Sequence, residues 1–176
     1  LEDAAKYGGN FGLGSPSPEI IRSFAELSGV RQVVSDYPFE YTVLLEDGTM
    51  SSQSHLNGEA RFSWDGAVLK EIAVPETAGA AAGITEDGTF VFQPTGWERE
   101  KKLKEWPEKL KQICAGNGLV GLTEDGMVIA EEAELDYIIN MVEKWSGISQ
   151  VAAQGGTVVG MKEDGTVVAV CTLGND

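Results

Sequence analysis

The tripeptide Glu-Asp-Gly recurs four times along the chain, and this repeat restricts the possible folds more than any other feature of the sequence. The copies begin at Glu46, Glu86, Glu124 and Glu163, which gives intervals of 40, 38 and 39 residues. Intervals this even are typical of repeat proteins, in which one small structural unit is copied along the chain. A unit of about 40 residues cannot bury its own apolar face, so neighbouring units must supply the core together.

Each copy of the tripeptide lies between two short apolar segments. Thr42–Leu45 precedes the first copy, for example, and Val167–Val170 follows the last. An apolar segment, Asp-Gly and a β-branched segment are the pattern of a tight β-hairpin, because Asp and Gly tolerate the positive φ of a two-residue type I′ turn. The sequence therefore predicts four hairpins with their turns at the tripeptides.

A third apolar segment precedes every hairpin and has the form apolar-polar-polar-apolar-small. The four segments are Val30–Val34, Leu69–Ala73, Leu110–Cys114 and Ile148–Ala152. Short strands that are apolar on both faces favour sheets packed between sheets. We therefore expect an all-β fold with short helices, a β-propeller-type array of four blades of three to four antiparallel strands. A single repeat domain, 1–176, would hold blades at approximately 27–65, 66–105, 106–144 and 145–171.

Several segments resemble the repeat of the regulator-of-chromosome-condensation family in its bacterial version. They are Trp145–Ala153, Gly160–Val170 and Tyr7–Gly14, the last of which resembles the Gly-x-Asn-x-x-Gly-x-Leu-Gly ending of a family blade. The resemblance implies a β-propeller scaffold. Family members include exchange factors, a β-lactamase inhibitor and surface proteins, so the resemblance implies a fold more closely than a function. One departure is that the family's usual histidine is missing from the glycine corner of every blade.

The predicted number of blades does not settle how the propeller ring is completed. Family propellers have about seven blades, and four is the low end of what closes into a ring. Residues 1–14, which resemble a blade ending, could pair with the last blade and close a ring. Alternatively, the chain is a fragment of a longer propeller, or a homodimer makes a ring of about eight blades. Since an open end would expose a sheet edge, we expect a fragment or a dimer.

The charge of the chain restricts its partners. There are 28 Asp and Glu residues against 13 Lys and Arg, which gives a net charge of −15. Binding to nucleic acid or to an anionic membrane requires a basic surface, so neither partner is expected. A protein partner, especially a basic one, is compatible with this charge. The sequence leaves the compartment open, and an extracellular or cell-surface location is slightly favoured over a cytoplasmic one.

No group of residues has the spacing of a metal, cofactor or catalytic site. His55 is the sole histidine, and Cys114 and Cys171 match no zinc pattern, so we expect both thiols to be free and buried. The tripeptide acids lack the alternating ligands of an EF-hand loop, and the chain has no Gly-x-Ser-x-Gly motif. We therefore predict no metal, no cofactor and no enzymatic activity, and we interpret the tripeptides as structural turns.

Two connections between the predicted strands have helical patterns. Apolar residues recur at helical spacing within Glu131–Trp145, and Ser17–Leu27 begins with a capping serine and a proline in the first turn. In the charged stretch Trp97–Lys111, Pro107 would break or begin a helix. We expect these segments to pack on the outer rim, with partner docking by one of them as the alternative.

The leading candidates for partner binding are the aromatic residues Tyr37, Phe39 and Tyr41. They occupy a corner between two strands where later blades have small residues, such as 116–118. Aromatic clusters are enriched in interface hot spots. The alternative is that the three rings cover the first blade or stack on the helix predicted before it. The second candidates, in irregular linkers, are Trp64 and Trp97.

These observations favour a non-catalytic, protein-binding propeller module that presents loops from one face to a macromolecular partner. The first alternative is a structural repeat segment of a larger bacterial surface protein. The second is a glycan-binding or hydrolytic propeller that uses acidic residues at its mouth. Such a site would require two carboxylates about 5–10 Å apart.

Overall fold

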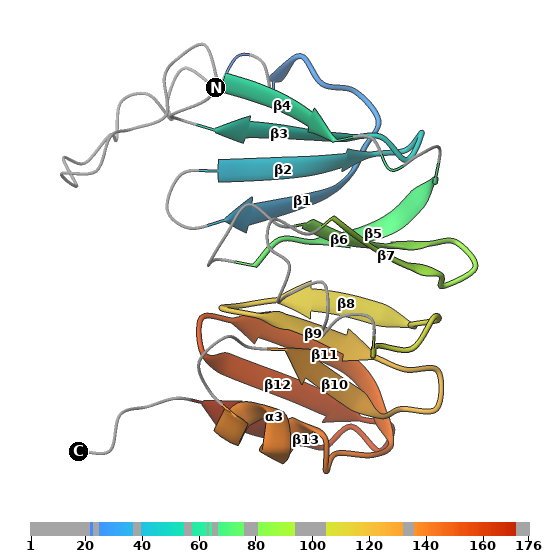
Figure 1. Ribbon diagram of the computed structural model, residues 1–176, viewed down its shortest axis with the longest axis vertical. Coiled ribbons are helices and arrows are strands. Elements are labelled where there is room, and N and C mark those ends of the chain that lie inside the picture. Colours follow the sequence, from blue (N-terminus) through green and yellow to red (C-terminus); the bar gives the residue numbers. More distant parts are fainter. Residues whose placement is uncertain are drawn as a thin grey trace, which may run out of the picture.

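The computed structural model describes residues 22, 25–36, 40–54, 58–62, 64, 67–75, 81–93, 105–131 and 136–171. Within these residues thirteen strands form four antiparallel sheets, which follow one another along the molecule (Figure 1). The strands are β1 (Val30–Asp36), β2 (Glu40–Leu45), β3 (Met50–Ser54), β4 (Gly58–Phe62), β5 (Leu69–Ala73), β6 (Ala81–Thr85), β7 (Phe90–Gln93), β8 (Gln112–Ala115), β9 (Leu119–Leu122), β10 (Val128–Glu131), β11 (Ile148–Gln154), β12 (Thr157–Lys162) and β13 (Val167–Cys171).

Consecutive strands are neighbours within every sheet. We call the sheets blade 1 (β1-β2-β3-β4), blade 2 (β5-β6-β7), blade 3 (β8-β9-β10) and blade 4 (β11-β12-β13). The predicted fold class is therefore confirmed: the chain is a partial β-propeller of four blades, with four strands in the first blade and three in each of the others. The residue numbers at which one blade gives way to the next stay a prediction.

Each Glu-Asp-Gly tripeptide connects the second and third strands of its blade, but the predicted two-residue turn is wrong. In blade 1 the Gly48 N–H donates to the carbonyl oxygen of Leu45, and the Leu45 N–H donates to that of Thr49, so the loop has three residues. The same two hydrogen bonds close the other three loops, and the loop glycines have φ between 80° and 83°. This is the three-residue hairpin loop that ends in a left-handed glycine.

The aspartate side chain explains why the longer loop forms. Asp47 Oδ1 accepts hydrogen bonds from the Thr49 N–H at 2.9 Å and from the Thr49 hydroxyl at 2.7 Å. Asp164 and Thr166 make the same two bonds in blade 4, at 2.9 and 2.6 Å. A short acidic side chain that bonds the backbone two residues later stabilises a turn, and here it holds the loop one residue wider than the type I′ turn.

The blades stack through two apolar faces each. We call the face that packs on the preceding blade the leading face, and the face that packs on the following blade the trailing face. Between blades 3 and 4, the trailing face contributes Val120, Leu122 and Val128, and the leading face contributes Ile148, Val151, Val158 and Val170. All of these side chains are buried, and equivalent clusters lie between blades 1 and 2 and between blades 2 and 3. Each buried Val or Leu contributes about 1.5–3 kcal/mol, so the stack supplies the core that no single blade has.

A glycine in the second strand makes room for a tryptophan in the last two blades. A Cβ atom on Gly121 would lie 3.1 Å from the Trp106 ring, and one on Gly160 would lie 3.1 Å from the Trp145 ring. Both tryptophans pack against the core clusters. Blade 1 has Val43 at the equivalent position, and the segment before its first strand contains no tryptophan.

A glutamine in the first strand joins one blade to the backbone of the next. The Gln32 side chain donates to the Ile72 carbonyl oxygen at 2.9 Å and accepts from the Ile72 N–H at 2.7 Å. The Gln112 side chain makes the same pair of bonds to Val151, at 3.0 and 2.9 Å. Each clamp satisfies one backbone donor and one acceptor that the sheet ladders leave free. We call this contact the amide clamp.

The tripeptide glycines also contact the next blade. The Gly88 carbonyl oxygen accepts the Leu110 N–H at 2.8 Å, and the Gly126 carbonyl oxygen accepts the Ile148 N–H at 3.1 Å. A Cβ atom on Gly88 would lie 2.9 Å from the Leu110 carbonyl oxygen, which is closer than real Cβ contacts. This position therefore requires glycine for two reasons, which are the positive φ of the loop and the close approach of the neighbouring blade.

The predicted helix over Glu131–Trp145 is too long. Helix α3 spans Asp136–Val142, and Glu131 is the last residue of β10, where it pairs with Leu119. At the start of this segment, strand pairing outweighs the helical spacing of the apolar residues. At its end, the Trp145 N–H donates to the Val142 carbonyl oxygen after the last residue of the helix.

The two other segments with helical expectations are only partly described. In the described part of 97–111, residues 105–111 form no helix, and Thr89 and Lys109 form an isolated bridge. The segment predicted over 17–27 lies mostly outside the described residues, where Arg22 and Ala25 are helical. The described residues contain no helix with the length and apolar character to cross a membrane.

The two roles of the loop glycine can be separated by experiment. Gly165 has the same left-handed φ as Gly88, but its Cβ position has no atom within 4 Å. Gly165→Ala should therefore cost only the backbone strain of about 1–2 kcal/mol, whereas Gly88→Ala should cost about 2–4 kcal/mol because the blades must also separate. Urea denaturation measures both free energies of unfolding. Equal losses would contradict a role of Gly88 in blade stacking.

Candidate partner-binding surface

The connections between the first and second strands gather at one end of the blades. In antiparallel blades these connections lie opposite the tripeptide loops. In blades 3 and 4 they touch: the Asn117 N–H donates to the Gly155 carbonyl oxygen at 2.9 Å, and a Cβ atom on Gly116 would lie 2.3 Å from that oxygen. We call this end the corner surface, and its described residues are 74–75, 116–118 and 155–156. Close approach of two backbones requires the glycine at 116.

The aromatic candidates follow the first strand of blade 1 in the sequence. Tyr41 lies in β2, where its Cα pairs with those of Ser35 and Gln53. Tyr37 and Phe39 lie between β1 and β2, outside the described residues. The topology thus assigns the aromatic segment to the same kind of connection that carries Gly116 in blade 3. Its role in binding stays a prediction.

Of the two linker tryptophans, Trp64 is described and Trp97 lies outside the described residues. Trp64 is half-buried and packs against the cluster between blades 1 and 2, which includes Leu44 and Met50. Its Nε1–H is buried and has no hydrogen-bond acceptor among the described residues. This position gives Trp64 a role in the stack, and a role in partner binding stays a prediction.

At the opposite end, three of the tripeptide aspartates, Asp47, Asp87 and Asp164, are held as carboxylates by hydrogen bonds around their loops. Hydrogen bonds from the Thr49 side chain and backbone lower the pKa of Asp47. The Thr166 side chain and backbone lower the pKa of Asp164, and the hydroxyls of Thr85 and Thr89 with Lys109 hold the pKa of Asp87 well below its usual range. Hydrogen bonds to the charged form explain these shifts. These acids are therefore unsuited to donate a proton near neutral pH.

Ion pairs connect the loop of blade 2 to both neighbouring blades. Arg31 of blade 1 lies 2.7 Å from a Glu86 carboxylate oxygen, and Lys109, ahead of blade 3, lies 3.2 Å from Asp87. All four side chains are exposed, so solvent weakens both pairs. The pairs nonetheless place two basic residues, Arg31 and Lys109, beside the acidic loop of blade 2.

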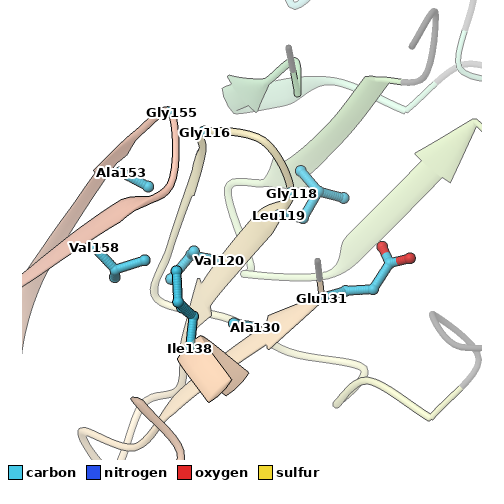
Figure 2. Close-up of a pocket in the computed structure, with 10 residues that line it drawn as sticks. All are labelled: Gly116, Gly118, Leu119, Val120, Ala130, Glu131, Ile138, Ala153, Gly155 and Val158. Carbon is cyan, nitrogen blue, oxygen red and sulfur yellow. The ribbon is translucent and has the colours of Figure 1, made fainter. Parts of the chain in front are cut away.

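A small pocket lies between blades 3 and 4 beside the corner surface (Figure 2). Its free volume is about 10 Å³, which is room for about one water molecule. Figure 2 shows the side chains of Val120, Ile138 and Val158 together on one side and the Glu131 carboxylate pointing away from them. The pocket is thus too small for a sugar or another organic substrate.

The described residues contain no group of three or more His, Cys, Asp and Glu side chains that could hold a metal ion. Both cysteines are free as expected, and Cys114 and Cys171 are half-buried rather than buried. Burial and the nearby Glu71 carboxylate raise the pKa of Cys114 to about 12. Since the thiolate is the nucleophile, Cys114 is unreactive near neutral pH. His55 lies outside the described residues.

Comparison with known proteins shows the fold. No protein-family model matches the chain, and no curated protein matches its sequence. Among solved structures, Prp20p from Saccharomyces cerevisiae is similar with a TM-score of 0.56 and 12% identity, over 74% of this chain and 42% of that chain. Human WBSCR16 is similar with a TM-score of 0.60 and 11% identity, over 83% and 48%. Yeast RCC1 (Prp20) bound to Kap60 gives a TM-score of 0.50 and 11% identity, over 74% and 41%.

These likenesses agree with the resemblance found in the sequence. The fold is an RCC1-like β-propeller, and the chain spans less than half the length of each of these solved structures. At identities of 11–12%, these similarities show the fold and say nothing about the partners of this chain.

The amide clamp was not predicted from the sequence. Its signal was present at the third residue of each first-strand segment. This residue is Gln32 in blade 1, Gln112 in blade 3 and Gln150 in blade 4, and it is Glu71 in blade 2. A polar residue kept at one position of an otherwise apolar strand indicates a side chain with a fixed partner.

Glu71 is the departure from this pattern. Its carboxylate accepts the Ile113 N–H, but unlike an amide it cannot also donate to the carbonyl oxygen. Burial raises the pKa of Glu71 above its ordinary 4.5, while the Ile113 hydrogen bond and Lys70 oppose that rise. A raised pKa in the folded state means that protonated Glu71 favours folding. This contribution is fully present below pH 4.5 and is lost as the pH rises through the raised pKa.

Restoring the amide should therefore stabilise the protein. Glu71→Gln is expected to raise the free energy of unfolding by about 1 kcal/mol at pH 7, because a second hydrogen bond forms and no charge is desolvated. The gain should shrink toward pH 4, where a protonated Glu71 can donate. The reciprocal change Gln112→Glu should destabilise, and more at pH 7 than at pH 4. Urea denaturation across this pH range tests both, and a pH-independent difference would contradict the clamp.

Proposed function

We propose that the chain is a non-catalytic, protein-binding propeller module that presents the corner surface to a macromolecular partner. The observation that carries the proposal is the use of the repeated polar residues. The tripeptide acids close their own loops, and the clamp glutamines bind the next blade. Partner recognition is then left to residues that differ between blades.

The aromatic segment is the largest such difference at the corner surface. Tyr37, Phe39 and Tyr41 stand in the first connection, whereas the third has Gly116 and Gly118. Tyr and Phe supply large contact areas with few rotatable bonds, which suits an interface. The net charge of −15 favours a basic protein partner over nucleic acid.

The solved structures with this fold support a protein partner by analogy. Prp20p is described with binding properties to Gsp1p and histones, and yeast RCC1 (Prp20) is described bound to Kap60. A propeller of this kind thus offers a rigid scaffold for protein contacts. An extracellular or cell-surface location and a bacterial origin stay expectations.

A second candidate is a structural repeat segment of a larger surface protein. The exposed trailing face of blade 4 favours it, because Val167 and Met161 are exposed at positions that are buried in blade 3. The two candidates differ in whether the corner surface binds anything.

The aromatic segment provides the test. Replacing Tyr37, Phe39 and Tyr41 with Ala should leave the melting temperature within a few degrees and weaken capture of a specific partner at least about tenfold, since hot-spot aromatics each contribute about 2 kcal/mol. Quantitative affinity capture with the unchanged chain, the triple variant and Tyr137→Ala measures this. Tyr137 is an exposed aromatic residue of α3 and serves as the matched control. Equal capture by all three baits would refute binding by this segment, and loss of folding would show that the rings are core.

A further inference from the structure

The interface between blades 2 and 3 differs from the other two interfaces in one polar contact. We call it the middle interface, and we call the contacts of blade 1 with blade 2 and of blade 3 with blade 4 the outer interfaces. Each outer interface contains a complete amide clamp, in which a glutamine binds the backbone of Ile72 or Val151. At the middle interface Glu71 takes the place of the glutamine and accepts the Ile113 N–H. An ionised carboxylate has no proton to donate, so it cannot bind the Ile113 carbonyl oxygen as well.

Two other contacts of the middle interface are of the same kind as those of the outer interfaces. Its apolar cluster includes Leu110 and Ile113, which are 0% and 2% exposed. The Leu110 N–H donates to the Gly88 carbonyl oxygen at 2.8 Å, just as the Ile148 N–H donates to Gly126 at 3.1 Å between blades 3 and 4. Apolar packing and the glycine contact therefore hold the middle interface as they hold the others, and the clamp is the contact that differs.

The groups that act on the Glu71 carboxylate within the described residues are Lys70 of its own strand and, from blade 3, the Ile113 N–H and Cys114. Cys114 is a neutral thiol near neutral pH, because burial and Glu71 raise its pKa to about 12. Lys70 and the Ile113 N–H favour the charged carboxylate, but burial outweighs them and raises the pKa of Glu71 above 4.5. Glu71 therefore takes up its proton at a higher pH in the closed interface than in water.

Opening of the middle interface reverses this effect on Glu71. Once the blades separate, water reaches the carboxylate and its pKa returns toward 4.5. Because Glu71 binds its proton more tightly in the closed state, protonation favours closing. This contribution is fully present below pH 4.5 and is lost as the pH rises through the raised pKa. The protonated carboxyl also has an O–H that can donate to the Ile113 carbonyl oxygen, which completes the clamp.

We propose that the middle interface is a pH-dependent joint, at which the two halves of the molecule separate transiently near neutral pH and stay closed in mild acid. The halves are β1–β7 and β8–β13 (Figure 1). The outer interfaces have amide clamps, which do not titrate, so they keep the same stability over this pH range. Residues 74–75 of blade 2 and 116–118 of blade 3 lie on the two sides of the joint. Its opening therefore changes the spacing between these parts of the corner surface.

Amide hydrogen exchange followed by NMR tests the proposal, because the three clamped N–H groups are equivalent. Protection factors correct for the pH dependence of the exchange chemistry and report how often each interface opens. At about pH 7 the Ile113 N–H should be about tenfold less protected than those of Ile72 and Val151, since its clamp lacks one hydrogen bond and carries a partly desolvated charge. At about pH 5 this difference should shrink at least about threefold. The range stays above the lowered pKa values of three tripeptide aspartates, so their loops keep their charge.

Variants of the clamp residue remove or move the pH dependence. Glu71→Gln should raise the protection of the Ile113 N–H about fivefold at neutral pH and make it independent of pH. Glu71→Ala should lower that protection at both pH values, because the acceptor is lost. Gln112→Glu should transfer the pH dependence to the Val151 N–H of the outer interface. Tyr137→Ala, at an exposed site on α3, is the control and should change none of these ratios.

The Leu110 N–H shows whether the whole interface opens or only the Glu71 side chain moves. Its hydrogen bond to Gly88 belongs to the same interface but not to the clamp. If the interface opens as a unit, the Leu110 N–H should gain protection together with the Ile113 N–H, both in mild acid and in Glu71→Gln. The Ile148 N–H, which makes the same kind of bond between blades 3 and 4, should gain none.

Three results would overturn the proposal. They are equal protection of the three clamped N–H groups at neutral pH, a difference between them that does not change with pH, and a response of the Ile113 N–H that the Leu110 N–H does not share. The outcome is independent of the proposed partner binding, because the measurement uses the chain alone.

Discussion

The architecture depends on the contact between the first strand of one blade and the first strand of the next. These strands belong to different sheets, so the regular ladders do not pair their facing backbone groups. The amide of Gln32 or Gln112 solves this problem, because one side chain supplies a donor and an acceptor to a single residue of the neighbouring strand. Buried backbone groups without partners are costly, so the clamp fixes both the distance and the register of adjacent blades.

The other repeated residues follow from this close spacing. The tripeptide glycine approaches the next blade within the reach of a Cβ atom at Gly48, Gly88 and Gly126, so no other residue fits without movement. The aspartate beside it belongs to the loop, where it bonds a threonine. The glycine and the glutamine thus serve the interface between blades, whereas the aspartate stabilises its own loop. The stack is stabilised by many equivalent contacts rather than by one large core.

The sequence predicted the elements whose causes are local. Asp-Gly between apolar segments placed the four hairpins correctly, since turn chemistry and alternation act over a few residues. The three-residue loop was missed because the Asp47 side chain, and not the backbone preference alone, selects it. The helix was predicted too long because Glu131 pairs with Leu119 in a strand, and pairing across blade 3 outweighs helical spacing. The clamp joins residues 39 or 40 apart in sequence, so no local pattern could reveal its partner.

The difference between repeated residues and residues that vary from blade to blade also bears on the proposed partner binding. Most residues that recur in the blades already have a fixed contact, either within their own loop or with the next blade. The partner binding that we propose therefore relies on positions where the repeat is broken. The aromatic segment of Tyr37 to Tyr41 is such a position, because it replaces the small residues of other blades.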